Sequence, residues 1–352
     1  MPKIGRFVID THVHAQRFAA GKKLREQTGD SAKKNSDYND LASAMRFMEP
    51  YENSERLFYD MDCYGVDMCI LQPAFGMNNE INVELVKKYP NKFRALAMAR
   101  ETANRHASGE EIWTAEAACR ELDELLATGN FVGIGEGPAT RPTAQNMPGT
   151  NHKCTLDMKE RLEELRLTMD VARKHGVPVT IHTGGTGGYP LDHTRWPENW
   201  HPYYVGDIAS EYPDVPIIFC HGGMQGGYME DLVDQCIVVA ASNTNVYLET
   251  GLYWTELYYK ALSYPNVGPE KLIWGTDWGS SIPTQTRIGQ KPQSFAMQIQ
   301  SQGVIRYQCD VMGWSLKQLE RLDISQDDLN LIVAGNALKL FKIDFPISRM
   351  FR

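Results

Sequence analysis

Short apolar runs and longer segments with helically spaced apolar residues alternate along most of the chain. The short runs are rich in β-branched and aromatic side chains, which suit buried strands. This pattern predicts strands at residues 7–9, 67–71, 93–98, 131–134, 178–181, 215–220, 245–248 and 271–274. The intervening segments predict helices at residues 53–64, 79–88, 114–127, 156–174, 205–212, 229–241 and 254–263.

Strands that alternate with helices are typical of parallel βαβ units, and about eight of them predict an α/β fold of the closed (β/α)8, or TIM, barrel type. No change in composition marks a second domain, so we expect a single domain over residues 1–352. Residues 15–50 and 278–315 are much longer than ordinary barrel loops. We expect them to be loop insertions at the C-terminal face of the barrel.

Histidines and acidic residues follow several of the predicted strands. The first strand leads into His12 and His14, whose side chains point the same way because they lie two positions apart. Two such imidazoles can bind one metal ion, although a motif this short also occurs as two unrelated polar residues. Further candidates follow later strands: Glu136, His182, His221 and Asp277.

The carboxyl ends of all strands in a barrel meet at one face, where barrel enzymes have their active sites. Each candidate alone could be a hydrogen-bonded rim residue or a helix cap. Together they predict a metal site, and glycines after three of the positions would let the backbone approach a ligand closely.

Composition narrows the functional classes. The net charge of -8 without a basic cluster argues against a nucleic-acid surface. We find no apolar run of the roughly 20 residues that a membrane helix requires, and no signal-peptide pattern. The seven cysteines show no CxxC spacing, which favours reduced core thiols. We therefore expect a cytoplasmic protein that acts on a small molecule, without nucleic-acid or membrane partners.

Several motifs together resemble the amidohydrolase superfamily of metal-dependent barrels, and within it the branch that includes aminocarboxymuconate-semialdehyde decarboxylase. They are VIDTHVH, SERLFYDMDCYGVDMCIL, VPVTIHTGG, YPDVPIIFCHGG, KLIWGTDWG and IVAGNALKLF, which span nearly the whole chain. The resemblance implies a divalent metal ion that activates water. Its ligands carry over onto His12, His14, His182 and Asp277, and His221 matches a second-site ligand or an acid/base group.

Two features differ from parts of this family. Many of its aromatic decarboxylases begin with an ExH strand, whereas this chain has HxH, which fits hydrolases and the semialdehyde decarboxylase better. Glu136, in GIGEGP, lies near the place where two-metal members have a bridging group. It is either a bridging ligand or a residue that binds substrate or pairs with Arg141. We expect zinc if the site holds one ion, and iron or manganese if it holds two.

The loop between residues 184 and 203 carries aromatic and cationic side chains that would suit an anionic or planar substrate. Its tryptophans could equally form a subunit contact, so a homo- or hetero-oligomer is expected. The candidate substrate-binding residues are Tyr189, Arg195, Trp200 and His201.

These observations favour a metal-dependent hydrolase that acts on a small organic substrate. We expect this substrate to carry a carboxylate. Asp277 is the candidate general base, and His221 is placed to polarise or protonate the substrate. The alternatives are a nonoxidative decarboxylase or hydratase of an aromatic or muconate-like acid, a dinuclear iron or manganese oxygenase, and a non-catalytic barrel subunit of a hetero-oligomer.

Overall fold

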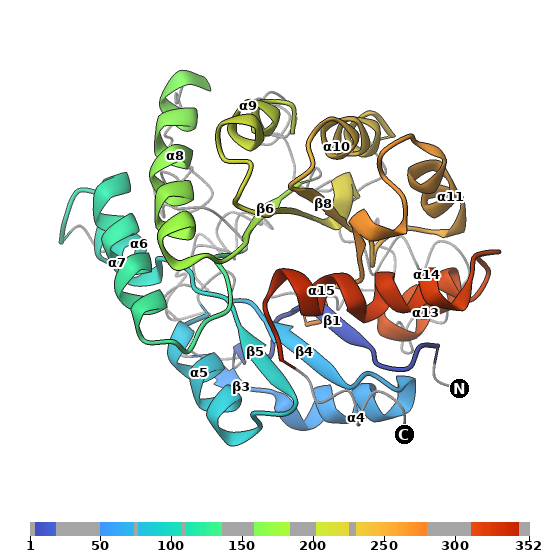
Figure 1. The fold of residues 1–352 in the computed structure, drawn as a ribbon. Coiled ribbons are helices and arrows are strands. Elements are labelled where there is room, and N and C mark those ends of the chain that lie inside the picture. Colours follow the sequence, from blue (N-terminus) through green and yellow to red (C-terminus); the bar gives the residue numbers. More distant parts are fainter. Residues whose placement is uncertain are drawn as a thin grey trace, which may run out of the picture.

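The computed structural model describes residues 4–18, 50–73, 77–107, 110–135, 158–183, 202–224, 230–279 and 311–344. Helices form a ring around a central set of parallel strands, as Figure 1 shows. The predicted α/β barrel architecture is confirmed in these residues.

The strands form two parallel sheets. One has the order β1 (Ile9–Val13), β4 (Met68–Leu71), β5 (Phe93–Ala95). The other has the order β6 (Val179–His182), β7 (Ile217–Cys220), β8 (Val246–Glu249), β9 (Leu272–Ile273). Each of the predicted strands except residues 131–134 contributes one of these elements.

Isolated bridges join the two sheets on both sides. Ile134 bridges Ala97 and Val179, and Val13 bridges Trp278. The predicted strand 131–134 is therefore present only as a bridging segment. Backbone bonds from Ala97 N to Gly133 O and from Ile134 N to Pro178 O run through it. The strands are thus in hydrogen-bonded contact around a ring, although the two named sheets are not one continuous sheet.

The helices lie outside the strands (Figure 1). Asn78 and Thr114 cap two of them through their side chains, as expected for these residue types. The helices are α4 (Ser54–Tyr64), α5 (Asn79–Lys88), α6 (Arg100–Ala107), α7 (Ala115–Ala127), α8 (Met158–His175), α9 (Tyr204–Glu211), α10 (Glu230–Ser242), α11 (Thr255–Ser263), α13 (Val311–Leu319), α14 (Gln326–Asn330) and α15 (Asn336–Leu340), with a π-helical turn at Leu331–Gly335.

Helix α6 was not predicted from the sequence. Its residues, RETANRHA, contain alanine as the only apolar type, so no helical stripe of larger apolar side chains marks it. Its first turn is stabilised instead by Glu121 of α7, whose carboxylate accepts the backbone N–H groups of Glu101 and Thr102 at 2.9 and 2.7 Å.

The predicted insertion at 15–50 begins and ends in a short antiparallel pair, β2 (Gln16–Phe18) and β3 (Pro50–Glu52). Residues 19–49, and residues 280–310 of the second predicted insertion, lie outside the described residues. Residues 311–315, predicted as the end of that insertion, belong to helix α13 and not to a loop. No helix among the described residues is long and apolar enough to cross a membrane.

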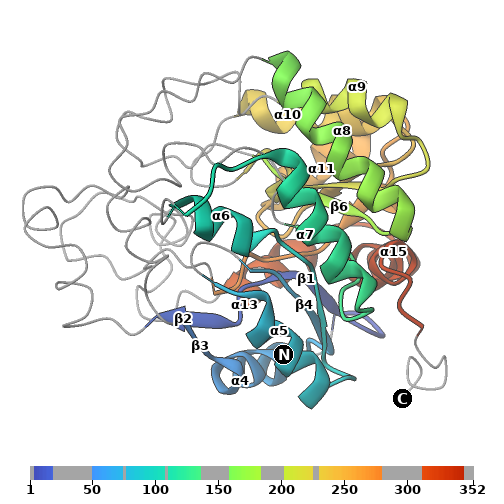
Figure 2. The same cartoon turned by 90° about the vertical axis from the view of Figure 1, so that its left-hand side faces the viewer.

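The end of the barrel opposite the carboxyl ends of the strands is filled with apolar side chains. Ile9, Met68, Ile218 and Ile273 form a buried cluster there with residues of α15 and its neighbours, including Phe341. Figure 2 shows α15 on the opposite side of the strands from β2 and β3. The polar strand-end side chains therefore face the other end of the barrel.

Candidate metal centre

Three predicted ligands converge where the first and last strands meet. His12 Nε2 and His14 Nε2 lie 3.2 Å apart, and Asp277 Oδ1 lies 3.0 Å from His14 Nε2 and 3.7 Å from His12 Nε2. His12 and His14 are fully buried or nearly so. These three side chains form a group that could hold a metal ion.

The spacing fits coordination of a single cation. Nitrogen and oxygen ligands that bind an ion at about 2.1 Å lie about 3.0–3.5 Å from one another in tetrahedral or octahedral geometry. Two of the three separations, 3.2 Å between the histidines and 3.0 Å between His14 and Asp277, lie in this range, and the third, between His12 and Asp277, is slightly longer at 3.7 Å. The residues present therefore fit a divalent metal ion.

Both histidines are oriented by a hydrogen bond at the other ring nitrogen. His12 Nδ1 donates to Glu249 Oε1 at 2.9 Å, and His14 Nδ1 donates to the backbone oxygen of Gln72 at 2.8 Å. Because both partners are acceptors, each Nδ1 carries a proton, and each Nε2 can bind a metal ion in the neutral ring, which has no proton there. Such partners fix the tautomer and ring orientation of metal-binding histidines.

Glu249, the last residue of β8, is the functional residue that the sequence analysis missed. It is completely buried, and its Oε1 also accepts the backbone N–H of His221 at 3.1 Å. Glu249 Oε2 has no hydrogen-bond partner within the described part of the chain. Asp277 was predicted because it is an acidic residue at the end of a predicted strand. Glu249 also lies at the end of a predicted strand, before Thr250 and Gly251, so the same criterion could have found it.

The carboxylate of Glu249 occupies space that only glycine leaves free. A Cβ atom on Gly275 would lie 2.7 Å from Glu249 Cδ and 2.6 Å from Thr11 Oγ1. Any larger residue at this position would displace the group that orients His12.

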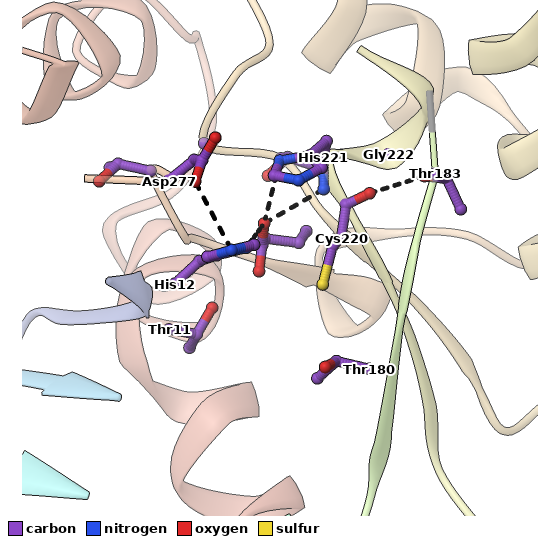
Figure 3. Close-up of polar contacts among 12 residues, drawn as sticks. Thr11, His12, Thr180, Thr183, Cys220, His221, Gly222 and Asp277 are labelled. Carbon is purple, nitrogen blue, oxygen red and sulfur yellow. Dashed lines mark hydrogen bonds and ion pairs between the residues drawn. The ribbon is translucent and has the colours of Figure 1, made fainter. Parts of the chain in front are cut away.

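His221 lies directly after β7, beside His12. The ring centroids of His12 and His221 are 4.8 Å apart, and Figure 3 shows His12, His221 and Asp277 turned toward one another. His221 has a left-handed backbone with φ of 64°, which is uncommon for a residue other than glycine. His12, His221 and Glu249 form a second group of possible ligands.

His182, at the end of β6, lies beside His221. Its ring centroid is 4.8 Å from that of His221. Within the described residues, His182 belongs to neither of the two ligand groups. Its assignment as a ligand stays a prediction.

Asp277 also has a left-handed backbone, with φ of 57°. Its position is set by the preceding residue, because Thr276 donates its N–H and Oγ1–H to the carboxylate of Asp10 at 2.9 and 2.5 Å. Asp10 also accepts the backbone N–H of His12 at 3.1 Å. One carboxylate therefore connects the segments that carry His12 and Asp277.

Burial raises the pKa of the carboxyl groups of Asp10 and Asp277, whereas hydrogen bonds from neighbouring residues lower it. Burial raises the pKa of Asp10 to about 7, although hydrogen bonds from Thr276 and His12 oppose the shift. Burial also raises the pKa of Asp277, but the hydrogen bond from His14 and the charges of the neighbouring histidines outweigh it, so this pKa lies below its usual range. Asp277 is therefore ionised at neutral pH.

The possible bridging residue Glu136 and the loop residues Tyr189, Arg195, Trp200 and His201 lie outside the described residues.

The comparisons with known proteins identify the family of this chain. A family model described as Amidohydrolase, that of the amidohydrolase-2 family, matches residues 9–343. This chain belongs to the amidohydrolase-2 family. The resemblance drawn from the sequence motifs is thereby confirmed, and the chain is a metal-dependent enzyme of the amidohydrolase superfamily. No curated protein matches the chain.

Solved structures of amidohydrolases share the fold at low sequence identity. A 5-carboxyvanillate decarboxylase from Novosphingobium aromaticivorans, complexed with manganese and a nitrobenzoic acid, is 13% identical with a TM-score of 0.53, covering 97% of this chain and 98% of its own. A probable 2-pyrone-4,6-dicarboxylic acid hydrolase from Acinetobacter baumannii is 15% identical with a TM-score of 0.49, covering 96% and 99%. At 13% identity the likeness to the decarboxylase structure concerns the fold alone.

Proposed function

We propose that this amidohydrolase is a hydrolase that acts on a small carboxylated organic substrate with one divalent metal ion held by His12, His14 and Asp277. The observation that carries the proposal is the convergence of these three donor atoms within 3.0–3.7 Å. Both histidines are oriented by a hydrogen bond at Nδ1. Glu249 and Asp277 together supply two negative charges, which a divalent cation would neutralise inside a buried site.

When bound, a divalent ion in this site would act as a Lewis acid and lower the pKa of water toward neutrality. Asp277 would accept a proton from water there, since its carboxylate is ionised at neutral pH and faces both His12 and His14. His221 lies on the other side of His12, where its ring can donate to the oxygen of a scissile carbonyl or to the leaving group.

Zinc is the ion we propose for a single-ion site, because imidazole and carboxylate donors suit it. A second ion would require further ligands, and the prediction that Glu136 bridges two ions rests on a residue outside the described part of the chain. About two equivalents of iron or manganese per chain would instead favour the oxygenase.

The test is to compare the wild-type protein with Asp277→Asn. We expect the variant to lose at least about 100-fold in hydrolytic rate and to bind metal more weakly, because the neutral amide is a poorer ligand and no longer accepts a proton. Metal content is measured by elemental analysis, and turnover on a panel of carboxylated esters, amides and lactones. A parallel assay for released CO2 on aromatic and muconate-like acids tests the decarboxylase alternative.

Asp214→Asn is the matched control. Asp214 is exposed and pairs with Arg173 on the outside of the barrel, so its loss should change neither metal content nor turnover. Wild-type hydrolysis by Asp277→Asn would contradict the proposal, and so would CO2 release without hydrolysis by the wild-type protein.

A further inference from the structure

The turn that carries His221 has an unusual backbone. His221, Gly222 and Gly223 have φ of 64°, 52° and 90°, so three consecutive residues lie in the left-handed region. Glycine enters this region readily, whereas histidine stays there only where the surrounding structure holds it. Residues held in this way are concentrated at functional sites, where the contacts that oppose the strain also fix the direction of the side chain.

One hydroxyl holds this turn on both sides of His221 in the chain. Thr183 directly follows His182, the last residue of β6, which pairs with Cys220 in β7. Thr183 Oγ1 donates to the backbone oxygen of Cys220 at 2.6 Å, as Figure 3 shows, and accepts the backbone N–H of Gly223 at 2.9 Å. Thr183 is buried, so the loss of its hydroxyl would leave backbone groups without a partner inside the protein.

A second buried hydroxyl holds the middle of the turn. Tyr253, in the connection between β8 and α11, is fully buried, and its phenol donates to the backbone oxygen of Gly222 at 2.8 Å. A Cβ atom on Gly222 would lie 2.5 Å from the phenol oxygen and 2.9 Å from the ring. The turn therefore packs directly on Tyr253, and Gly222 leaves no room for a side chain there.

Both hydroxyls act on the backbone around a residue whose ring belongs to the candidate site. The ring of His221 lies beside those of His12 and His182, with centroids 4.8 Å away in each case. A change in the backbone of His221 would turn its ring, because the direction of a side chain follows φ and ψ. Neither Thr183 nor Tyr253 belongs to the ligand groups found among the described residues.

We propose that Thr183 and Tyr253 are positioning residues, whose hydroxyls hold His221 in its left-handed conformation and so aim its imidazole at the reacting group of the substrate. The inference rests on the role of His221 in the proposed function. It deepens that function by naming two residues that act on the reaction only through His221.

The test compares Thr183→Val with Thr183→Ser. Valine has the shape of threonine without the hydroxyl, whereas serine keeps the hydroxyl and loses a methyl group. In Thr183→Val we expect kcat to fall about 10- to 100-fold while KM changes by less than about twofold, because a misplaced acid weakens the transition state and not the binding of substrate. Thr183→Ser should recover most of kcat. Turnover is measured with the metal-loaded protein on the ester, amide or lactone that it hydrolyses fastest.

The position of His221 is measured separately by NMR of protein labelled with 13C and 15N in histidine, with and without zinc. The signals of His221 are assigned by their absence from His221→Asn. We expect the Cα and Cβ shifts, which report the backbone conformation, to be the same in Thr183→Ser as in the wild-type protein. In Thr183→Val they should move away from the left-handed values. Tyr253→Phe should move them in the same direction by less, because it loses one bond and not two.

Thr168→Val is the matched control. Thr168 is also a buried threonine, but it lies in α8, and its hydroxyl is 3.9 Å from Cys119 Sγ. Its replacement should leave both kcat and the signals of His221 unchanged. Circular dichroism and metal content confirm that the Thr183 and Tyr253 variants are folded and loaded.

Wild-type kcat in folded Thr183→Val would overturn the inference, and so would unchanged signals of His221 in that variant. A fall in kcat that Thr183→Ser does not recover would also contradict it, because the hydroxyl would then not be the group that matters.

The variant Asp277→Asn separates these results from a failure of the proposed function. If the metal assignment is wrong, Asp277→Asn keeps wild-type turnover, while Thr183→Val still moves the signals of His221. If only the positioning role is wrong, Asp277→Asn loses turnover, and Thr183→Val has the kcat and the spectrum of the wild-type protein. If the wild-type protein hydrolyses none of the esters, amides and lactones, the proposed function fails, and the signals of His221 alone decide the inference.

Discussion

The orientation of His12 depends on Glu249, which is not a member of the ligand group His12, His14 and Asp277. The Nδ1–H of His12 donates to Glu249 Oε1 at 2.9 Å, and the same oxygen accepts the backbone N–H of His221 at 3.1 Å. One buried carboxylate thus orients a metal ligand and the neighbouring candidate acid/base residue. Loss of such a partner commonly weakens metal binding without removing a ligand.

We therefore expect Glu249→Gln to weaken metal affinity by about 10- to 100-fold. The neutral amide polarises the imidazole of His12 less and leaves the charge of a bound cation less balanced. Affinity is measured by competition with a chelator. Glu249→Asp should also bind weakly, because its shorter side chain does not reach His12.

Glu211→Gln serves as the control for this prediction, since Glu211 pairs with Arg166 on the exposed surface. If Glu249→Gln binds metal as tightly as the wild-type protein does, Glu249 has no orienting role.

At the scale of the elements, the segments that directly follow β8 and β9 are in close backbone contact. A Cβ atom on Gly251 would lie 1.8 Å from the backbone oxygen of Gly275. Backbone atoms cannot rotate away as a side chain can, so a larger residue would separate the two strand ends.

Gly251→Ala should accordingly lower the free energy of unfolding by about 3 kcal/mol or more, at the upper end of overpacking costs. Gly206→Ala in α9 is the matched control. There the nearest atom to an added Cβ is Asn243 Nδ2 at 3.9 Å, an ordinary contact, and alanine is the better helix former.

We expect Gly206→Ala to be neutral or to stabilise the protein by roughly 0.5–1 kcal/mol. Urea unfolding followed by circular dichroism measures both variants. Equal stability of Gly251→Ala and the wild-type protein would show that the strand ends separate at little cost.

At the scale of the whole molecule, the candidate metal centre lies at the seam of the barrel, which is the place where the first strand meets the segment that follows the last strand. His12 and His14 come from the first strand, and Asp277 follows the last one. Backbone bonds from Thr11 N to Trp274 O, His14 N to Trp278 O and Trp278 N to His12 O close the same seam. A bound ion would therefore link segments at opposite ends of the sequence.

Removal of the metal by a chelator should destabilise the fold, by about 2.7 kcal/mol relative to protein with free metal at 100 times its dissociation constant. Hydrogen exchange should show where. We expect faster exchange in β1 and in residues 272–279, and little change between β6 and β7, whose bond ladder does not include the ligand group. A uniform increase over all strands would contradict a role for the ion at the seam.

The sequence by itself determined the order of strands and helices and most of the candidate ligands. The alternation of apolar runs is a local pattern, because each strand and helix must bury its own apolar face. His12, His14, His221 and Asp277 were found because a strand end in a parallel barrel has only one possible face. Helix α6 was missed because its polar sequence carries no such pattern.

Only the tertiary structure decided which of these side chains meet. It brought His12, His14 and Asp277 within 3.0–3.7 Å, placed Glu249 at Nδ1 of His12, and placed His182 beside His221. It also brought the hydroxyl of Thr183 against the turn that carries His221. These contacts join residues far apart in the sequence, and their distances depend on how the barrel closes. Local periodicity carries no information about that closure.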